Sequence, residues 1–174
     1  MRIIKCTTKH LNSVSAFYDK VTEYLEKQIN YPKWTQGNYP GTESTRQAIA
    51  DDVQYACMDG DKVVGAFILN DNPQGDYNVG DWRVNLSQGE YLVIHTLATD
   101  PEIYRKGLGR YMVEYCIHTA KENGYKAVRL DVIPTNAPAR RLYENMGFLF
   151  AGEKDLSRDI KDISTFALYE LNFL

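Results

Sequence analysis

The order of the apolar segments from residue 53 onward constrains the fold of this chain most. Short apolar or alternating runs predict strands, and apolar residues recurring three and four positions apart predict helices. Along the chain these patterns give strand, strand, strand, helix, strand, helix, strand and strand. That order implies a mixed β-sheet with helices packed on its faces, which is an α/β (α+β) fold.

Turn and capping residues set the bounds of these predicted elements. Asp59-Gly60-Asp61 is typical of a hairpin turn between two strands. The predicted strands are 53–58, 62–69, 90–99, 127–132, 148–152 and 166–172, and the predicted helices are 107–123 and 137–146.

The first 50 residues predict an amphipathic helix followed by an irregular aromatic segment. The apolar face of the helix carries Leu11, Val14, Tyr18, Val21 and Leu25. Asn12 or Ser13 is the expected N-cap. Two prolines and two glycines exclude a regular element from residues 31–41. A short strand at 3–7 and a helix at 44–51 complete this part.

Length and charge exclude several classes of protein. With 174 residues, of which 44% are apolar and 25% charged, the chain is expected to form a single domain over residues 1–174. Its net charge of −3 gives no basic field for binding nucleic acid. The longest unbroken apolar run, 63–69, is far shorter than the ~20 residues that span a bilayer. Without a signal peptide at its start, we expect a cytoplasmic protein.

Cysteine and histidine spacing predicts no metal site. Cys6, Cys57 and Cys116 are odd in number and far apart, and no Cys-x-x-Cys occurs. The three histidines show no metal-ligand spacing either. We therefore expect buried thiols and no bound metal.

A glycine-containing segment, 100–110, joins a buried strand to a long helix. Helix N-termini expose unpaired N–H groups and carry partial positive charge. Glycines let an anion approach the backbone closely. The segment contains Gly107 and Gly109 and the cations Arg105, Lys106 and Arg110. This combination predicts an anion site, best suited to a diphosphate.

Two better-known phosphate motifs do not match this segment. A Walker loop needs Gly-Lys followed by Ser or Thr after a longer glycine loop, and that sequence is absent. A dinucleotide fingerprint needs a third glycine where Met112 stands. Gly-x-Gly also occurs as an ordinary helix cap. The segment alone therefore leaves a plain cap and an anion site both open.

A second motif, 136–148, begins 27 residues after Gly109 and reads Asn-Ala-Pro-Ala-Arg-Arg-Leu-Tyr-Glu-Asn-Met-Gly-Phe. Together the two motifs resemble the GNAT superfamily of N-acetyltransferases. That family pairs an Arg/Gln-x-x-Gly-x-Gly/Ala loop with a later Asn-x-x-Ala…Leu-Tyr-Glu-x-x-Gly-Phe helix. The resemblance covers residues 53–172 best. Tyr104 departs from the family's Arg or Gln, although Arg105-Lys106 beside it keep the positive charge.

The resemblance implies the GNAT fold, a mixed sheet splayed between two parallel strands, here 90–99 and 127–132, with helices on both faces. Acetyl-CoA would lie in that split. Backbone groups of Leu97, Ala98 and Thr99 would bind its pantetheine arm. The diphosphate would lie on Arg105, Lys106, Gly107, Leu108, Gly109 and Arg110. Asn136, Ala139 and Tyr143 would face the cofactor from the other side.

The implied reaction is direct attack of a primary amine on the acetyl-CoA thioester. By resemblance Tyr143 is the candidate general acid that protonates the leaving sulfur; packing against the cofactor is the alternative. His95 is the candidate base, since its strand resembles the His-x-Leu-Ala-Val segment of serotonin N-acetyltransferase, with Val93 in place of the second histidine. An imidazole, with an ordinary pKa near ~6.5, suits that task. A core histidine, Glu90 as base and a water chain remain open.

The acceptor is not readable from either motif. Tyr31, Trp34 and Tyr39 lie in the irregular segment and either line the acceptor pocket or cover the core. We expect a small-molecule amine. The alternatives are a non-catalytic CoA-binding or sensor domain and a protein N-terminal acetyltransferase. Monomer and homodimer both remain open.

Overall fold

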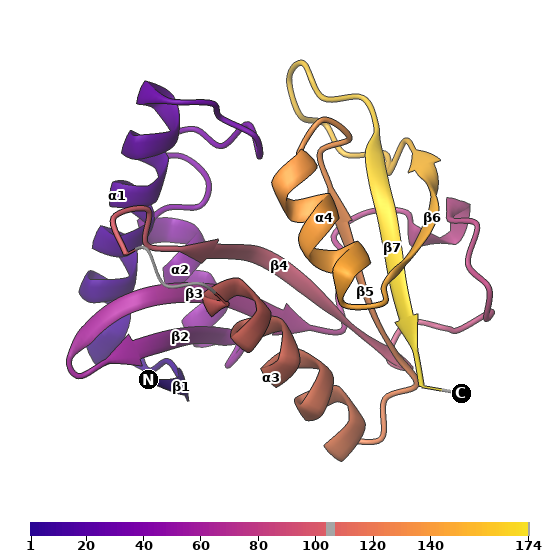
Figure 1. Ribbon diagram of the computed structural model, residues 1–174, viewed down its shortest axis with the longest axis horizontal. Helices are drawn as coiled ribbons and strands as arrows, with labels where there is room; N and C mark the ends of the chain where they lie inside the picture. Colours follow the sequence, from indigo (N-terminus) through magenta and orange to yellow (C-terminus); the bar gives the residue numbers. More distant parts are fainter. Residues whose placement is uncertain (104–106, 174) are drawn as a thin grey trace. The chain divides into compact units, whose positions relative to one another are not determined.

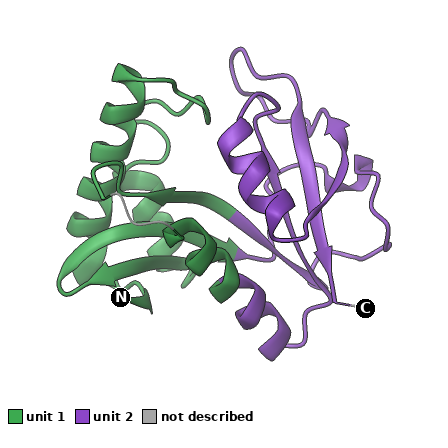
Figure 2. Cartoon of the chain, viewed as in Figure 1, with its two compact units in different colours: residues 1–69, 95–115 green, residues 70–94, 116–174 purple. Residues whose placement is uncertain are grey.

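The computed structural model describes residues 1–103 and 107–173 (Figure 1). These residues form two compact units, which Figure 2 shows in different colours. Unit 1 comprises residues 1–69 and 95–115, and unit 2 comprises residues 70–94 and 116–174. The strand 91–99 and the helix 108–122 each have residues in both units. A single domain over residues 1–174 stays a prediction.

The helices and strands follow the expected order (Figure 1). The strands are β1 (Arg2–Lys5), β2 (Gln54–Asp59), β3 (Lys62–Asn70), β4 (Tyr91–Thr99), β5 (Ala127–Val132), β6 (Leu149–Lys154) and β7 (Phe166–Asn172). The α-helices are α1 (Leu11–Lys27), α2 (Thr42–Ala50), α3 (Leu108–Glu122) and α4 (Ala137–Asn145). Two short 3-10 helices are η1 (Thr8–His10) and η2 (Tyr77–Val79).

The strands follow the order β1-β2-β3-β4-β5-β7-β6 in a seven-stranded sheet. β4 and β5 are parallel, whereas β1 with β2, β2 with β3, β5 with β7 and β6 with β7 are antiparallel. The parallel register joins Tyr91–Val93 to Ala127–Arg129, while β5 stays paired with β7 through Val132. The sheet is therefore mixed, which confirms the predicted α/β fold class.

Unit 1 is built on two faces of its strands. The core on one face joins α1 and α2 to the sheet through residues such as Tyr18, Ile49 and Ala66. Gly65, the neighbour of Ala66, faces the opposite side of the sheet because successive residues of a strand face alternate sides. A Cβ atom on Gly65 would lie 2.6 Å from Sδ of Met112 in α3. Helices thus cover both faces of this unit, and a glycine makes room for the side chain of α3.

The core of unit 2 lies under the long segment between β3 and β4. Tyr77 and Leu86 from that segment pack with Leu168 of β7. α4 covers the opposite face, where Tyr169 donates a hydrogen bond to Glu144 (2.6 Å) and accepts one from Arg140 Nε (2.8 Å). The segment 70–88 is therefore an integral part of this unit.

The sequence predictions for this fold are largely confirmed, with one clear error. β5 and β7 have the predicted bounds, and the side chains of Cys6, Cys57 and Cys116 are buried. The expected cap of α1 is wrong, because the N-cap is His10 rather than Asn12 or Ser13. Ser13 instead donates its hydroxyl to the carbonyl oxygen of His10 (3.0 Å). Within the described part of the chain, no helix has the length and apolar character needed to cross a membrane.

Candidate functional site

The start of α3 carries the glycine geometry of the predicted anion site. Gly107 has a φ of +90°, a conformation that L side chains rarely adopt, and its carbonyl oxygen accepts a hydrogen bond from the Tyr111 amide (2.8 Å). A Cβ atom at Gly107 would have no described atom within 4 Å, so backbone conformation rather than space requires glycine there. Leu108 and Gly109 form the first turn. Tyr104, Arg105 and Lys106 lie outside the described residues.

Arg110, the third predicted cation of this loop, lies within the helix. Its Nε donates to Oε1 of Glu114 one helical turn later (2.8 Å), and both side chains are exposed. Such an exposed pair is worth only a few tenths of a kcal/mol, about 0.3–0.5. The pair therefore does not prevent the guanidinium from turning to another anion.

A buried carboxylate anchors the backbone that leads from β4 toward α3. Asp100 is only 2% exposed and accepts hydrogen bonds from Lys20 Nζ (2.8 and 3.0 Å) and the Glu102 amide (2.9 Å). Lys62 Nζ lies 3.3 Å from the same carboxylate. Burial raises the pKa of Asp100, but these donors outweigh it and hold the pKa below its usual value. Asp100 is therefore ionised at neutral pH and fixes this end of the loop.

β4 is kinked near its C-terminal end. Thr96 has a φ of +49°, which is rare for a β-branched residue. Such a conformation costs of the order of 1–3 kcal/mol and persists only where the surrounding structure holds it. The hydroxyl of Tyr18 in α1 lies 3.0 Å from the Thr96 carbonyl oxygen and 3.1 Å from its Oγ1. Leu97 and Thr99, which follow the kink, are partly exposed, whereas Ala98 is buried in the core.

His95 immediately precedes this kink and is 8% exposed. It lies in the segment of β4 that belongs to unit 1, together with Leu97, Ala98 and Thr99. The strand thus places the candidate base beside the three residues predicted to bind the pantetheine arm.

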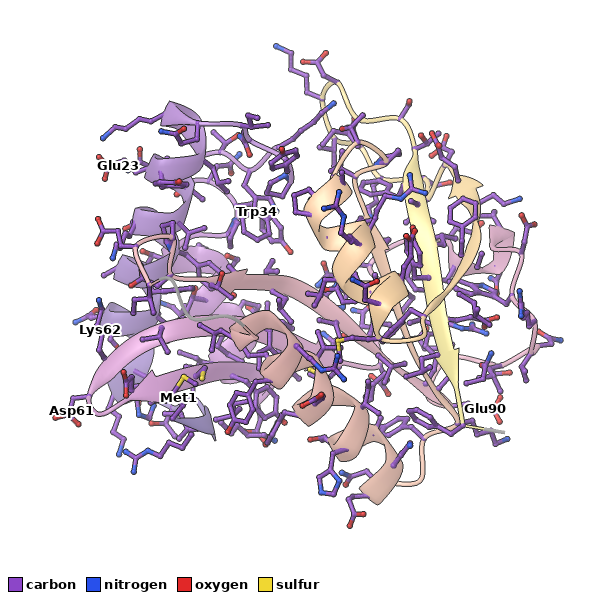
Figure 3. The ribbon with its side chains drawn as sticks, in the orientation of Figure 1. Met1, Glu23, Trp34, Asp61, Lys62 and Glu90 are labelled. Carbon is purple, nitrogen blue, oxygen red and sulfur yellow. The ribbon has the colours of Figure 1, made fainter. Side chains whose placement is uncertain are left out.

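The aromatic segment is attached to the same unit. Trp34 packs against the core cluster that contains Tyr18 and Ala98, and it is labelled in Figure 3. Asn30 holds the Trp34 backbone by accepting from its amide (3.1 Å) and donating to its carbonyl oxygen (2.7 Å). Tyr39 is exposed. Burial is the largest cause that raises the pKa of Tyr18, and the nearby Tyr39 acts in the same direction. Tyr31 is partly buried.

In unit 2, α4 carries the second predicted group of cofactor-binding residues. Asn136 is the N-cap, and its Oδ1 accepts from the Ala139 amide (3.2 Å), which orders the first turn. Tyr143 is 5% exposed, and its ring packs edge-on against Phe148. Burial, followed by the nearby Cys116 and Asp131, raises the pKa of Tyr143. The phenol is therefore protonated at neutral pH.

Glu90, the alternative base, precedes β4 and is labelled in Figure 3. One oxygen of its carboxylate forms an ion pair with Lys126. Its other carboxylate oxygen accepts from the Ser87 amide (2.8 Å). These hydrogen bonds from Lys126 and Ser87 lower the pKa of Glu90. A carboxylate held in this way is a weaker base than an unpaired one.

Arg158, in the connection between β6 and β7, holds the segment 70–88 in place. Arg158 pairs with both carboxylate oxygens of Asp131 (2.7 and 2.8 Å) and donates to the carbonyl oxygens of Pro73 (2.8 Å) and Gln74 (2.6 Å). Tyr77 donates to the same Asp131 (2.6 Å). Asp131 at the end of β5 therefore holds two loops of unit 2 together.

A cavity of about 330 Å³ also lies in unit 2, lined by residues of this segment and of the adjoining strands. The guanidinium of Arg129, one of the lining residues, lies 4.1 Å from the ring centre of Trp82 and 4.3 Å from that of Tyr91. The described lining includes none of the predicted site residues. This cavity is thus distinct from the residues predicted to bind acetyl-CoA or to act in catalysis.

Sequence reasoning missed two residues of unit 1 that shape the site, Tyr18 and Asp100. Tyr18 is one of the side chains on the apolar face of α1, where its ring is expected in the core. The one available signal was its hydroxyl, because a buried tyrosine usually finds a hydrogen-bond partner. Asp100 is typical of a residue that ends a strand, and no local pattern predicts that two distant lysines pair with it.

Comparison with known proteins identifies relatives over part of the chain. [Ribosomal protein bS18]-alanine N-acetyltransferase of Escherichia coli (strain K12) is 38% identical over 55 residues, which are 32% of this chain and 37% of that protein. Streptothricin acetyltransferase of Streptomyces lavendulae is 36% identical over 61 residues, which are 35% of this chain and 32% of that protein. The matched part thus spans about a third of the length of these curated relatives.

Solved structures resemble the fold over nearly its whole length. An acetyltransferase of the GNAT family from Streptococcus agalactiae 2603 has a TM-score of 0.78 at 13% identity, covering 98% of this chain and 94% of that one. An N-acetyltransferase from Staphylococcus aureus Mu50 has a TM-score of 0.68 at 14% identity, covering 98% and 97%. The acetyltransferase (GNAT) family model matches residues 17–148, which is most of the chain and includes parts of both units. The chain therefore belongs to the acetyltransferase (GNAT) family, whose members are acyltransferases that use acetyl-CoA.

Proposed function

We propose that this protein transfers the acetyl group of acetyl-CoA to a primary amine of a small molecule. The observation that carries the proposal is the start of α3, where the left-handed Gly107 precedes the first helical residue, Leu108. The residues fit the cofactor, because a helix N-terminus with glycines at and beside its first turn can accept a diphosphate. The family match across both units supports a single N-acetyltransferase domain over residues 1–174.

The residues proposed to hold acetyl-CoA come from three segments. The backbone of Leu97, Ala98 and Thr99 in β4 would bind the pantetheine arm. The loop residues Arg105 and Lys106 and the start of α3, from Gly107 to Arg110, would bind the diphosphate. In unit 2, Asn136, Ala139 and Tyr143 of the α4 motif would contact the cofactor as well.

Bound acetyl-CoA supplies an activated acetyl group as a thioester. We assign Tyr143 the role of general acid toward the departing sulfur. The phenol is protonated at neutral pH, as a general acid must be, although its raised pKa makes it a weaker acid than an ordinary tyrosine. A backbone N–H of the kinked strand is suited to stabilise negative charge on the acetyl oxygen.

The incoming amine must lose a proton, because alkyl amines have a pKa near ~10. We assign to His95 the role of the base that accepts this proton, because His95 lies in β4 beside the proposed pantetheine site. Glu90 is a weaker candidate, since its pairing with Lys126 lowers its pKa. A water chain is the remaining route.

His95→Gln is expected to reduce kcat mainly from about pH 7 to 9, where an ordinary imidazole is neutral while the amine still carries its proton. There the amine is mostly protonated and depends most on a base, whereas at high pH the free amine is abundant and the variant recovers. The measurement is a pH–rate profile of both proteins at saturating acetyl-CoA. A profile parallel to that of the wild type would remove His95 as the base and leave a water chain or Glu90.

Small-molecule amines fit the aromatic segment of unit 1 best. Trp34 packs against the core cluster containing Ala98, and Tyr39 remains exposed in the same segment. The relatives by name act on different acceptors, namely a ribosomal-protein alanine, mycothiol and streptothricin. They therefore do not select the acceptor class, and the aromatic segment is the basis for preferring a small molecule.

Trp34→Ala is expected to raise the KM of the acceptor more than that of acetyl-CoA. Because Trp34 also packs against the core, the melting temperature will fall as well. Trp34→Phe is the matched variant, since it keeps a ring against the core and removes the indole. Equal changes of both KM values, fully reversed in Trp34→Phe, would assign Trp34 to core packing alone.

The proposed function is tested by thiol release from acetyl-CoA across a panel of small primary amines and of peptides with free N-termini. Acceleration by a small amine supports the proposal. Binding of acetyl-CoA without release in any case would favour a non-catalytic CoA-binding or sensor domain. Release with peptides alone would favour a protein N-terminal acetyltransferase.

A further inference from the structure

The hydroxyl group of Tyr18 contacts the kink of β4 from outside the strand. Thr96 adopts a left-handed conformation, and only glycine takes that conformation freely. Tyr18 of α1 bonds both the carbonyl oxygen and Oγ1 of this residue, at 3.0 and 3.1 Å. Such strain persists only where the neighbouring structure holds it.

Tyr18 is suited to hold this position without changing state. The side chain is fully buried, and its ring packs edge-on against Phe17 within the core of unit 1. Burial raises the pKa of Tyr18 above its ordinary value. The phenol is therefore protonated over the whole working range of pH, so its hydroxyl can donate to the Thr96 carbonyl.

Holding this carbonyl oxygen also sets the direction of the next amide. The peptide group between Thr96 and Leu97 is planar and trans, so its C=O and its N–H point in opposite directions. With the oxygen bound to Tyr18, the N–H of Leu97 points away from that hydroxyl. A flip of this peptide group would reverse both.

We propose that Tyr18 is a positioning residue for acetyl transfer, which holds the Thr96 carbonyl so that the Leu97 N–H faces the acetyl oxygen. This inference rests on the proposed function. Tyr18 touches no reacting atom in this role, and it acts only through the backbone of β4. Its hydroxyl, and not merely its ring, is therefore required for turnover.

The first test is Tyr18→Phe, which keeps the ring and removes the hydroxyl. Because the loss of a single oxyanion donor lowers kcat by about 10²–10³, a loosened donor is expected to lower it by roughly tenfold or more. The KM of acetyl-CoA is expected to change less than kcat, since the phosphate loop and the backbone of Ala98 and Thr99 are untouched. An unchanged kcat would overturn the proposal.

A second change separates positioning from packing. Thr96→Gly removes the strain of the left-handed conformation, so the kink depends less on Tyr18. Tyr18→Phe is then expected to cost several-fold less kcat in the Thr96→Gly background than in the wild type. Thr96→Ala is the matched control, because it removes Oγ1 but keeps the strain, and it should give no rescue.

Denaturant unfolding of the same variants keeps the inference separate from the proposed function. The effect of Tyr18→Phe on the free energy of unfolding, like its effect on kcat, is expected to depend on the residue at position 96. Suppose that Thr96→Gly reduces the effect of Tyr18→Phe on the free energy of unfolding, but that Tyr18→Phe lowers kcat equally in the wild type and in Thr96→Gly. That result would overturn the positioning role and show that Tyr18 contributes to stability alone. If the wild type acetylates no amine, the proposed function itself fails, whether or not the stability coupling is found.

Discussion

Gly109→Glu is expected to abolish the binding of acetyl-CoA while the protein remains folded. Gly109 lies in the first turn of α3, where the diphosphate is proposed to bind. The new side chain brings both bulk and a negative charge to that position. Juxtaposing like charges costs several kcal/mol, which corresponds to a rise in Kd of more than roughly a hundredfold.

The fold should tolerate this change, because an acidic residue near a helix N-terminus is favourable. Isothermal titration calorimetry with acetyl-CoA measures the effect, and the melting temperature checks the fold. His118→Glu is the matched control, since it adds the same side chain at an exposed position later in α3. Unchanged affinity in Gly109→Glu would show that the diphosphate binds elsewhere.

Tyr143→Phe is expected to lower kcat by at least roughly tenfold, with little change in the affinity for acetyl-CoA. General acids typically contribute about 10²–10⁴-fold, and a phenylalanine keeps the packing against Phe148 while removing the proton donor. An interaction made only in the transition state has this kinetic signature. Steady-state kinetics give kcat, and calorimetry gives the affinity.

The pH dependence provides a further check on Tyr143. Because burial raises its pKa above the ordinary value of about 10, its protonated form persists through neutral and mildly alkaline pH. Ionisation of Tyr143 should therefore cause no loss of kcat below about pH 10. Tyr24→Phe, at an exposed position of α1, is the control for the substitution itself. A Tyr143→Phe variant with wild-type kcat would show that Tyr143 is not the general acid and contributes only by packing.

Local patterns were sufficient for most of the fold. The strand 127–132 is bounded by Asn123-Gly124 before it and by Pro134 after it, and the structure places β5 at those bounds. The paired motifs around Gly109 and Asn136 identified the family, because each combines a helix start with side chains in fixed order. The family match then confirmed that identification.

Features that depend on distant contacts could not be predicted. Nothing local marks Thr96 as left-handed, since a β-branched residue in an apolar run favours a regular strand. Its hydrogen-bond partner Tyr18 lies in α1, 78 positions away in the chain. The cap of α1 was missed for a related reason, since a short 3-10 helix precedes it and ends at His10.

Transfer of an acetyl group from acetyl-CoA to a small amine is the activity on which every assigned role depends. The most direct measurement uses acetyl-CoA with an isotopically labelled acetyl group, a panel of small primary amines and mass spectrometry of every product. We expect labelled N-acetyl amine with the wild type and at least roughly tenfold less with Tyr143→Phe. Label found only in unreacted acetyl-CoA or in free acetate, for every amine, would contradict this activity.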